Sequence, residues 1–110
     1  MQIHWTDFES VTQAQRDAVE RRIAALAEER GDLIDVRLVA HQTNHHRQGG
    51  SKVRIVCQAR GTEIVASCER PELGHALDEA VDDFEREVRR VRERRRSRSQ
   101  RVGRLGPVAC

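Results

Sequence analysis

The sequence predicts an α+β fold in which a four-stranded sheet carries two helices on one face, in the order β-α-β-β-β-α. Four segments alternate apolar and polar residues, which is the period of a strand with one buried face. Two other segments repeat their apolar residues every three or four positions, as amphipathic helices do. Because each strand offers a single apolar face, we expect both helices to cover the same side of the sheet.

Short local signals mark the N-terminal strand and the first helix. Apolar residues alternate from Met1 to Trp5, which predicts a strand with Trp5 in the core. Thr12 as N-cap and Gln15 three residues later form a capping box, and Gly31 supplies the stop of a helix that runs to about residue 29. The residues expected to face inward from this helix are Ala18, Val19, Ile23 and Leu26.

Three further strands are predicted over residues 33–40, 52–60 and 62–69. The inward face of the first of these is formed by Ile34, Val36, Leu38 and Ala40. A polar loop over residues 41–51 follows it, and a tight turn at Arg60-Gly61 joins the last two strands. A right-handed crossover makes the first strand of the chain parallel to the second, and the rest form an antiparallel meander. The two-residue turn pairs Ala59 with Thr62, Cys57 with Ile64, Ile55 with Ala66 and Val53 with Cys68.

The longest predicted element is a helix over residues 73–96. Its apolar residues form one stripe, made of Leu73, Leu77, Ala80, Phe84, Val88 and Val91. The rest of its surface begins acidic and ends basic, with arginines that have no acids left nearby in the sequence to pair with. Beyond it the periodicity stops, so we predict one domain over residues 1–96 and a basic, disordered tail over residues 97–110.

Charge is distributed unevenly along the chain. The formal net charge is +2, but residues 1–85 carry a balance of −6 and residues 86–110 a balance of +8. A basic end on an acidic body predicts a polyanionic partner, most often nucleic acid. An acidic membrane surface competes as the partner, but the basic end has few bulky apolar residues to insert. No segment is apolar enough to span a membrane and the start lacks the features of a signal peptide, so the predicted location is cytoplasmic.

Residues of the kinds that catalyse reactions or bind metals do not form a recognisable set. Three cysteines lack a CxxC spacing, and the predicted register puts Cys57 and Cys68 too far apart for a disulfide. There is no nucleophile elbow, Gly-rich phosphate loop or HExxH motif. We therefore predict a non-enzyme without metal, cofactor or small-molecule substrate. The alternative is a metal site formed by His41, His45 and His46 of the polar loop together with His4 or His75. The simpler interpretation of this segment is a solvated polar loop.

The aromatic residues decide which mode of nucleic-acid binding the chain can use. Trp5, Phe8 and Phe84 are the only aromatics, and two of them lie on buried stripes, so a base-stacking platform is not expected. Arginine contacts to the phosphates and shape of folded RNA remain. The predicted RNA-binding residues are Arg21, Arg22, Arg86, Arg89, Arg90, Arg92 and Arg94. The alternative is a solvated charged face, above all for the arginines with acids nearby, namely Arg16, Arg21 and Arg86.

One stretch of the longest helix carries a family resemblance. Residues 76–86 read Ala-Leu-Asp-Glu-Ala-Val-Asp-Asp-Phe-Glu-Arg and are followed by basic residues. The Met1-Gln2-Ile3 opening, Thr12 and residues 33–36 agree with the same pattern. Over residues 1–96 the sequence resembles the ribosome hibernation-promoting factors and ribosome-associated inhibitors, once called sigma-54 modulation proteins. The resemblance implies a fold like that of double-stranded-RNA-binding domains, lodged between the head and body of the small ribosomal subunit.

The resemblance also implies a function, which is reversible, non-catalytic inhibition of translation. Such proteins cover the messenger path and the tRNA decoding positions, and they silence and protect idle ribosomes. The family's basic positions match the predicted RNA-binding arginines, so the implied partners are the small ribosomal subunit and its ribosomal RNA. The resemblance is to the short form without a dimerising C-terminal domain, and we expect a monomer off the ribosome. The alternative is a protein-interaction or self-associating module of the same fold that does not bind ribosomes.

Overall fold

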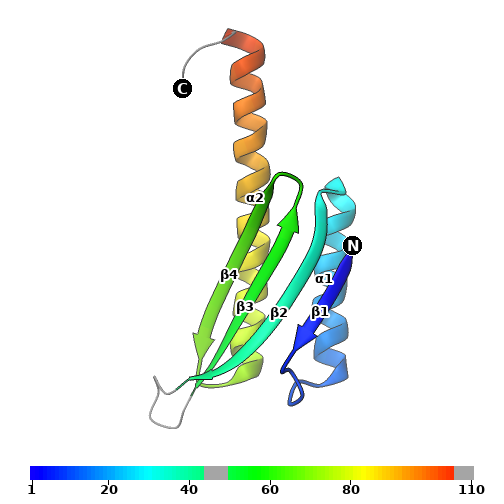
Figure 1. Ribbon diagram of the computed structural model, residues 1–110, viewed down its shortest axis with the longest axis vertical. Helices are drawn as coiled ribbons and strands as arrows, with labels where there is room; N and C mark the ends of the chain where they lie inside the picture. The colour runs from blue at the N-terminus through cyan, green and yellow to red at the C-terminus, as the bar shows by residue number, and fades with distance from the viewer. Residues whose placement is uncertain (44–49, 106–110) are drawn as a thin grey trace.

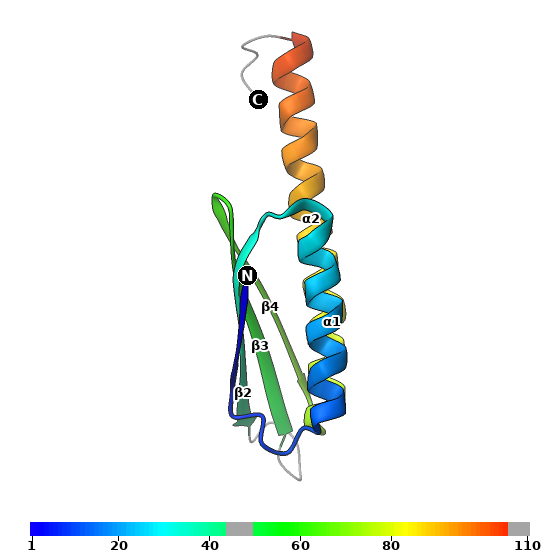
Figure 2. The same cartoon turned by 90° about the vertical axis from the view of Figure 1, so that its right-hand side faces the viewer.

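Six elements make up residues 1–43 and 50–105, the part of the chain that the computed structural model describes. They are β1 (Gln2–Thr6), α1 (Gln13–Arg30), β2 (Leu33–Thr43), β3 (Gly50–Ala59), β4 (Thr62–Arg70) and α2 (Leu73–Leu105). The strands form one sheet in the order β1-β2-β3-β4, with β1 parallel to β2 and the other neighbours antiparallel. Both helices lie on the same face of this sheet, and no described element covers the opposite face (Figures 1 and 2). The predicted β-α-β-β-β-α fold is confirmed.

The hairpin of β3 and β4 has the register that a two-residue turn predicts. Val53 pairs with Cys68 and Ala59 with Thr62, and the pairs between them also match the prediction. Gly61 occupies the turn with φ 76°, in the left-handed region that favours glycine. Because turn length and apolar alternation together set the register of a hairpin, local sequence sufficed to place its inward residues.

The start of β2 departs from the predicted alternation. The sequence predicts that Ile34 faces inward, but its side chain is 52% exposed and Leu33 is buried in its place. The pairing of β2 with β3 shifts between Leu33 and Asp35, which marks a β-bulge. A bulge inserts one extra residue, so the inward positions before it fall out of step with those after it. The prediction for Ile34 is therefore wrong, and from Val36 onward the alternation holds.

A matched pair of alanine substitutions tests the bulge. We expect Leu33→Ala to lower the free energy of unfolding by about 2 kcal/mol, because it removes buried apolar atoms and leaves a cavity. We expect Ile34→Ala to change it by less than about 0.5 kcal/mol, as is usual for exposed positions. Urea denaturation measures both values. Equal losses, or a larger loss at Ile34, would show that Ile34 faces the core after all.

Helix α1 is capped at both ends as predicted. The backbone N–H of Gln15 donates to Thr12 Oγ1 at 3.2 Å, and the Thr12 N–H donates to Gln15 Oε1 at 3.2 Å. Gly31 adopts the left-handed conformation with φ 60°, and its N–H donates to the carbonyl of Ala27 at 2.7 Å. These caps satisfy backbone groups that a helix leaves unpaired at its ends.

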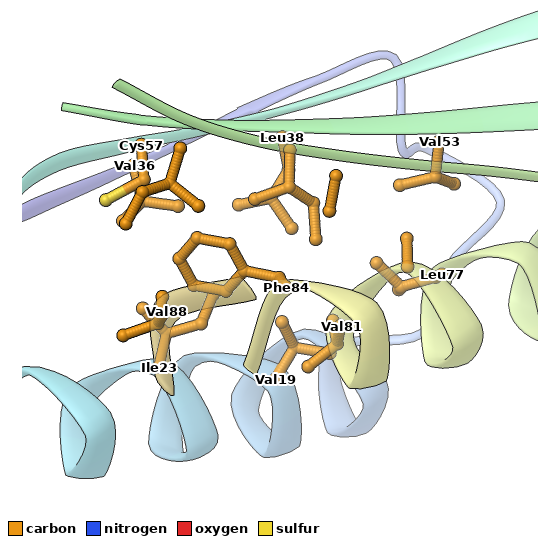
Figure 3. Packing of buried hydrophobic residues seen from close by; sticks show 14 of the residues in the cluster. Val19, Ile23, Val36, Leu38, Val53, Cys57, Leu77, Val81, Phe84 and Val88 are labelled. Carbon is orange, nitrogen blue, oxygen red and sulfur yellow. The ribbon is translucent and has the colours of Figure 1, made fainter. Parts of the chain in front are cut away.

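The core lies between the sheet and the two helices. Phe84 of α2 is fully buried at its centre, between residues of the sheet such as Leu38 and the α1 residue Ile23 (Figure 3). The predicted stripe of α2 is buried at its middle, and its ends at Leu73 and Val91 are partly buried against the core. The inward face predicted for α1 is confirmed except at Ala18, which is exposed. Ala18 directly precedes the first residue of the buried stripe, and successive residues are rotated by about 100° in a helix.

Helix α2 is longer than predicted. It continues to Leu105, so residues 97–105 are helical where the sequence predicts a disordered tail. Its C-terminal turns project beyond the sheet (Figure 1). No glycine or proline occurs between His75 and Val102, so the chain contains no strong helix breaker near residue 96. Residues 106–110 and much of the predicted loop over residues 41–51 lie outside the described residues, and the division at residue 96 stays a prediction.

Candidate nucleic-acid interface

The predicted RNA-binding arginines belong to α1 and α2, which run in the same direction on one face of the sheet (Figure 2). Two sets of side-chain contacts tie these helices together. One set joins Arg22 to the first half of α2, and the other joins Arg92 to the C-terminal end of α1. Two of the arginines expected to contact RNA therefore also join one helix to the other.

Arg22 bridges two carboxylates across the gap between the helices. Its Nη2 donates to Asp82 Oδ1 at 2.5 Å and also to Glu85 Oε1. Asp82 and Glu85 are three residues apart, which places them on one face of α2. The sequence does not reveal this bridge, because the acids lie 60 and 63 residues from Arg22. The charge of Arg22 is compensated by α2 in this structure, so Arg22 offers less to a phosphate than the sequence suggests.

Arg92 is the most deeply buried of the predicted RNA-binding arginines. Its side chain is only 8% exposed, and its donors point into the protein. Nη2 donates to the carbonyl of Leu26 and to Asp32 Oδ1, both at 2.7 Å, while Nε donates to Asp32 Oδ2 at 3.0 Å. Nη1 donates to Glu29 Oε2, also at 3.0 Å. These bonds, first of all those to Asp32, raise the pKa of Arg92 and keep it charged.

Arg92 therefore joins the two helices in this structure, and its contact with RNA stays a prediction. It donates to the carbonyl of Leu26, near the C-terminal end of α1, and to the carboxylate of Asp32, which directly precedes β2. A bidentate arginine–carboxylate pair is the geometry in which this side chain binds most strongly. The sequence suggested unpaired arginines at this end of the helix, because the partner acids come from a different element.

Arg86 and Arg90 have weaker partners on their own helix. Arg86 Nη1 lies 3.3 Å from Asp83 Oδ1, and Arg90 Nη1 lies 2.8 Å from Glu87 Oε1. Both arginine side chains are well over half exposed, and surface pairs of this kind contribute little and are screened by salt. A phosphate can therefore replace either carboxylate at low cost.

Arg21, Arg89 and Arg94 are exposed and form no ion pair with any residue that the structure describes. Arg30 shares both properties, and sequence reasoning missed it. An arginine in the last turn of a helix is usually explained by the helix dipole, so nothing at Arg30 pointed to a ligand. Arg21 lies in the middle of α1 and Arg30 in its last turn, while Arg89 and Arg94 lie at and beyond the middle of α2.

The described residues offer no arrangement typical of catalysis or metal binding. Burial raises the pKa of Cys57 to about 12, so its thiol stays protonated. No group of three His, Cys, Asp or Glu side chains in this part of the chain is placed to hold a metal ion. His4 Nε2 instead lies 3.0 Å from Asp35 Oδ1, and two histidines of the candidate cluster, His45 and His46, lie outside the described residues. None of the helices described is both long and apolar enough to cross a membrane.

Comparison with known protein families matches residues 1–96 to the family described as sigma 54 modulation protein / S30EA ribosomal protein. The chain belongs to this family. The family groups ribosome-associated factors and is not a known enzyme family. The resemblance carried by residues 76–86 is thereby confirmed.

Solved structures agree with this assignment at the level of the fold. The chain is similar to a ribosomal subunit interface protein from Coxiella burnetii, with 15% identity and a TM-score of 0.65 over 84% of this chain and 99% of that one. It is also similar to the N-terminal domain of Protein Y from Thermus thermophilus, with 24% identity and a TM-score of 0.60 over 82% and 94% of the two chains. Comparison with curated proteins finds no match.

Proposed function

We propose that this protein is a translation inhibitor that binds ribosomal RNA of the small subunit and occludes the messenger and tRNA decoding positions. Family membership supports association with the ribosome, and the Coxiella structure of the same fold is a ribosomal subunit interface protein. The observation that carries the RNA-binding part is the group of exposed arginines on the outer side of α1 and α2.

The chemistry of these arginines favours recognition of phosphates and shape over recognition of bases. Phe8 and Phe84 are fully buried, and Trp5 is partly buried with the guanidinium of Arg16 over its ring, so the aromatic residues do not form a base-stacking platform. Guanidinium groups bind phosphates with two parallel hydrogen bonds. The protein acts by steric occlusion: a small domain held by phosphate contacts excludes messenger and tRNA without any chemical step.

Charge reversal tests this proposal. We expect the triple variant Arg89→Glu, Arg90→Glu, Arg94→Glu to bind small ribosomal subunits at least about 100-fold more weakly than the wild type, because it replaces phosphate contacts by repulsion. Co-sedimentation at several salt concentrations measures the affinity, which should fall steeply with salt for the wild type. The contacts of Arg92 are left intact, so the variant should remain folded.

A matched control reverses three basic residues on the open face of the sheet, Arg37, Lys52 and Arg54, and should bind like the wild type. Unchanged co-sedimentation of the helix variant would overturn the proposal. Size-exclusion chromatography at the same salt concentrations tests the alternative function. A self-association that persists when salt has removed the RNA would favour a protein-interaction module.

A further inference from the structure

Strand β4 leaves one edge of the sheet open. Among the described strands it lies at the end of the sheet, and at nine residues it is nearly twice as long as β1 at the other end. It pairs with β3 without a bulge, and it contains no proline and no charged residue from Ile64 to Cys68. Proteins usually protect a sheet edge with a short strand, a bulge, a proline or a charge, and the middle of β4 has none of these.

The turn between β3 and β4 determines which backbone groups reach this edge. The residues on either side of a two-residue turn, here Ala59 and Thr62, exchange backbone hydrogen bonds, and bonded and non-bonded pairs then alternate along the hairpin. The N–H and C=O groups of Glu63, Val65 and Ser67 therefore point away from β3, towards the open edge. Their side chains lie on the face of the sheet that the helices do not cover, where Val65 is 40% exposed.

Beyond Ser67 the protein closes the edge itself. The next residue whose backbone groups point outward is Glu69, and Nη1 of Arg70 donates to the carbonyl of Glu69 at 2.6 Å. Arg70 also forms an ion pair with Glu79 of α2. A strand that paired over the Glu69 carbonyl would have to displace the Arg70 guanidinium, so the part of the edge that can accept a strand is limited to residues 63–67.

We infer that this segment pairs antiparallel with the same segment of a second copy of the chain, across a twofold axis at Val65. In this register Val65 is opposite the second copy's Val65, and Glu63 is opposite Ser67. The pairing forms about six backbone hydrogen bonds and joins two four-stranded sheets into one. A register centred on Ala66 would use the closed position at Glu69 and would place it opposite Glu63, and like charges directly opposite each other are destabilising.

Side chains and helices both fit a second copy of the chain. Val56 of β3 pairs with Val65, so the two valines already lie side by side on the open face of the sheet. The twofold pairing continues this apolar row across the interface and covers the exposed part of Val65 in both copies. Because α2 packs against both β3 and β4, the α2 helices of the two copies would lie about 10 Å apart, a distance at which helices pack.

Pairing at β4 is independent of RNA binding. It extends the sheet sideways and leaves the outer sides of α1 and α2 open, so it replaces the monomer expected from the family resemblance without opposing the proposed function (Figure 2). Backbone hydrogen bonds and valine contacts depend little on salt, unlike contacts to phosphates. The triple charge-reversal variant of α2 should therefore form dimers like the wild type. Only self-association that survives a charge at Val65 would support the alternative function, a protein-interaction module.

Sedimentation velocity over a range of concentrations tests the dimer. The apparent mass of the wild type should rise from 12.6 kDa towards twice this value. Val65→Lys places two like charges opposite each other and should remain monomeric. Val39→Lys makes the same change on the same face of the sheet but on β2, away from the edge, and should self-associate like the wild type. A wild type that stays monomeric up to about 1 mM, or a folded Val65→Lys variant that still forms dimers, would overturn the inference.

Cysteine cross-linking tests the register in a chain that carries Cys68→Ser and Cys110→Ser. The Cα atoms of a hydrogen-bonded antiparallel pair are about 5.5 Å apart, which is within the range of a disulfide. Val65→Cys should therefore form a covalent dimer in oxidised glutathione. Ser67→Cys should do so only when it is mixed with Glu63→Cys. Cross-linking of Ser67→Cys alone at the same rate as Val65→Cys would show that the two copies do not pair in this register, and the inference would be wrong.

Discussion

Replacing Arg92 by alanine is expected to lower the free energy of unfolding by about 3–5 kcal/mol, the range found when one partner of a buried ion pair is removed. The substitution leaves Asp32, whose side chain is only 16% exposed, without its bidentate partner. It also leaves the carbonyl of Leu26 without the donor that Arg92 provides at 2.7 Å. Urea denaturation followed by circular dichroism measures the loss.

Arg89→Ala is the matched control for this prediction. Arg89 precedes Arg92 by one turn of the same helix but is exposed and forms no ion pair with a described residue. Its replacement should change stability by no more than about 0.5 kcal/mol, while it should reduce binding to small subunits. Arg92→Ala should lower stability strongly but should leave binding to small subunits unchanged at temperatures where the variant is folded. Similar stabilities for the two variants would mean that Arg92 does not hold the helices together.

The features that the sequence predicted correctly are those encoded over short distances along the chain. The hairpin register follows from a two-residue turn and the alternation beside it, and the caps of α1 follow from Thr12, Gln15 and Gly31. The bulge at Ile34 could not be predicted in this way. Its residues read as regular alternation, and the shift appears only in the pairing with β3. The alternation of apolar residues reports on a single strand, whereas a bulge is defined by how two paired strands match.

The site shows the same dependence on sequence distance. Arg86 and Arg90 have partners three residues away, which a helical reading anticipates. The partners of Arg22 and Arg92 lie at least 60 residues away, so only the packed helices reveal that these two arginines hold the domain together. Arg30 was missed because the helix dipole already explains an arginine in the last turn of α1. The composition shows that the C-terminal part of the chain is basic. Only the tertiary structure shows which of its arginines form ion pairs within the protein.

The fully buried Phe84 gives the other large expected effect. Phe84→Ala removes an aromatic ring from the centre of the core and should lower the free energy of unfolding by about 3–5 kcal/mol. For a domain of this size the melting temperature should fall by on the order of 15 °C. Phe84→Leu keeps most of the buried atoms and should cost only about 1 kcal/mol. An alanine variant that melts within a few degrees of the wild type would show that α2 does not pack on the sheet through this residue.

The same variant separates the residues that hold α2 in place from those that bind. Phe84 points to the sheet (Figure 3), whereas the exposed arginines of α2 face outward. Well below its melting temperature, Phe84→Ala should therefore bind small ribosomal subunits with wild-type affinity. As the temperature approaches the melting point, its binding should decline in step with the loss of helical signal, because the unfolded chain no longer presents the arginines together. The triple charge-reversal variant should instead bind weakly at every temperature while remaining folded, so two measurements on two variants distinguish the role of the core from that of the basic surface.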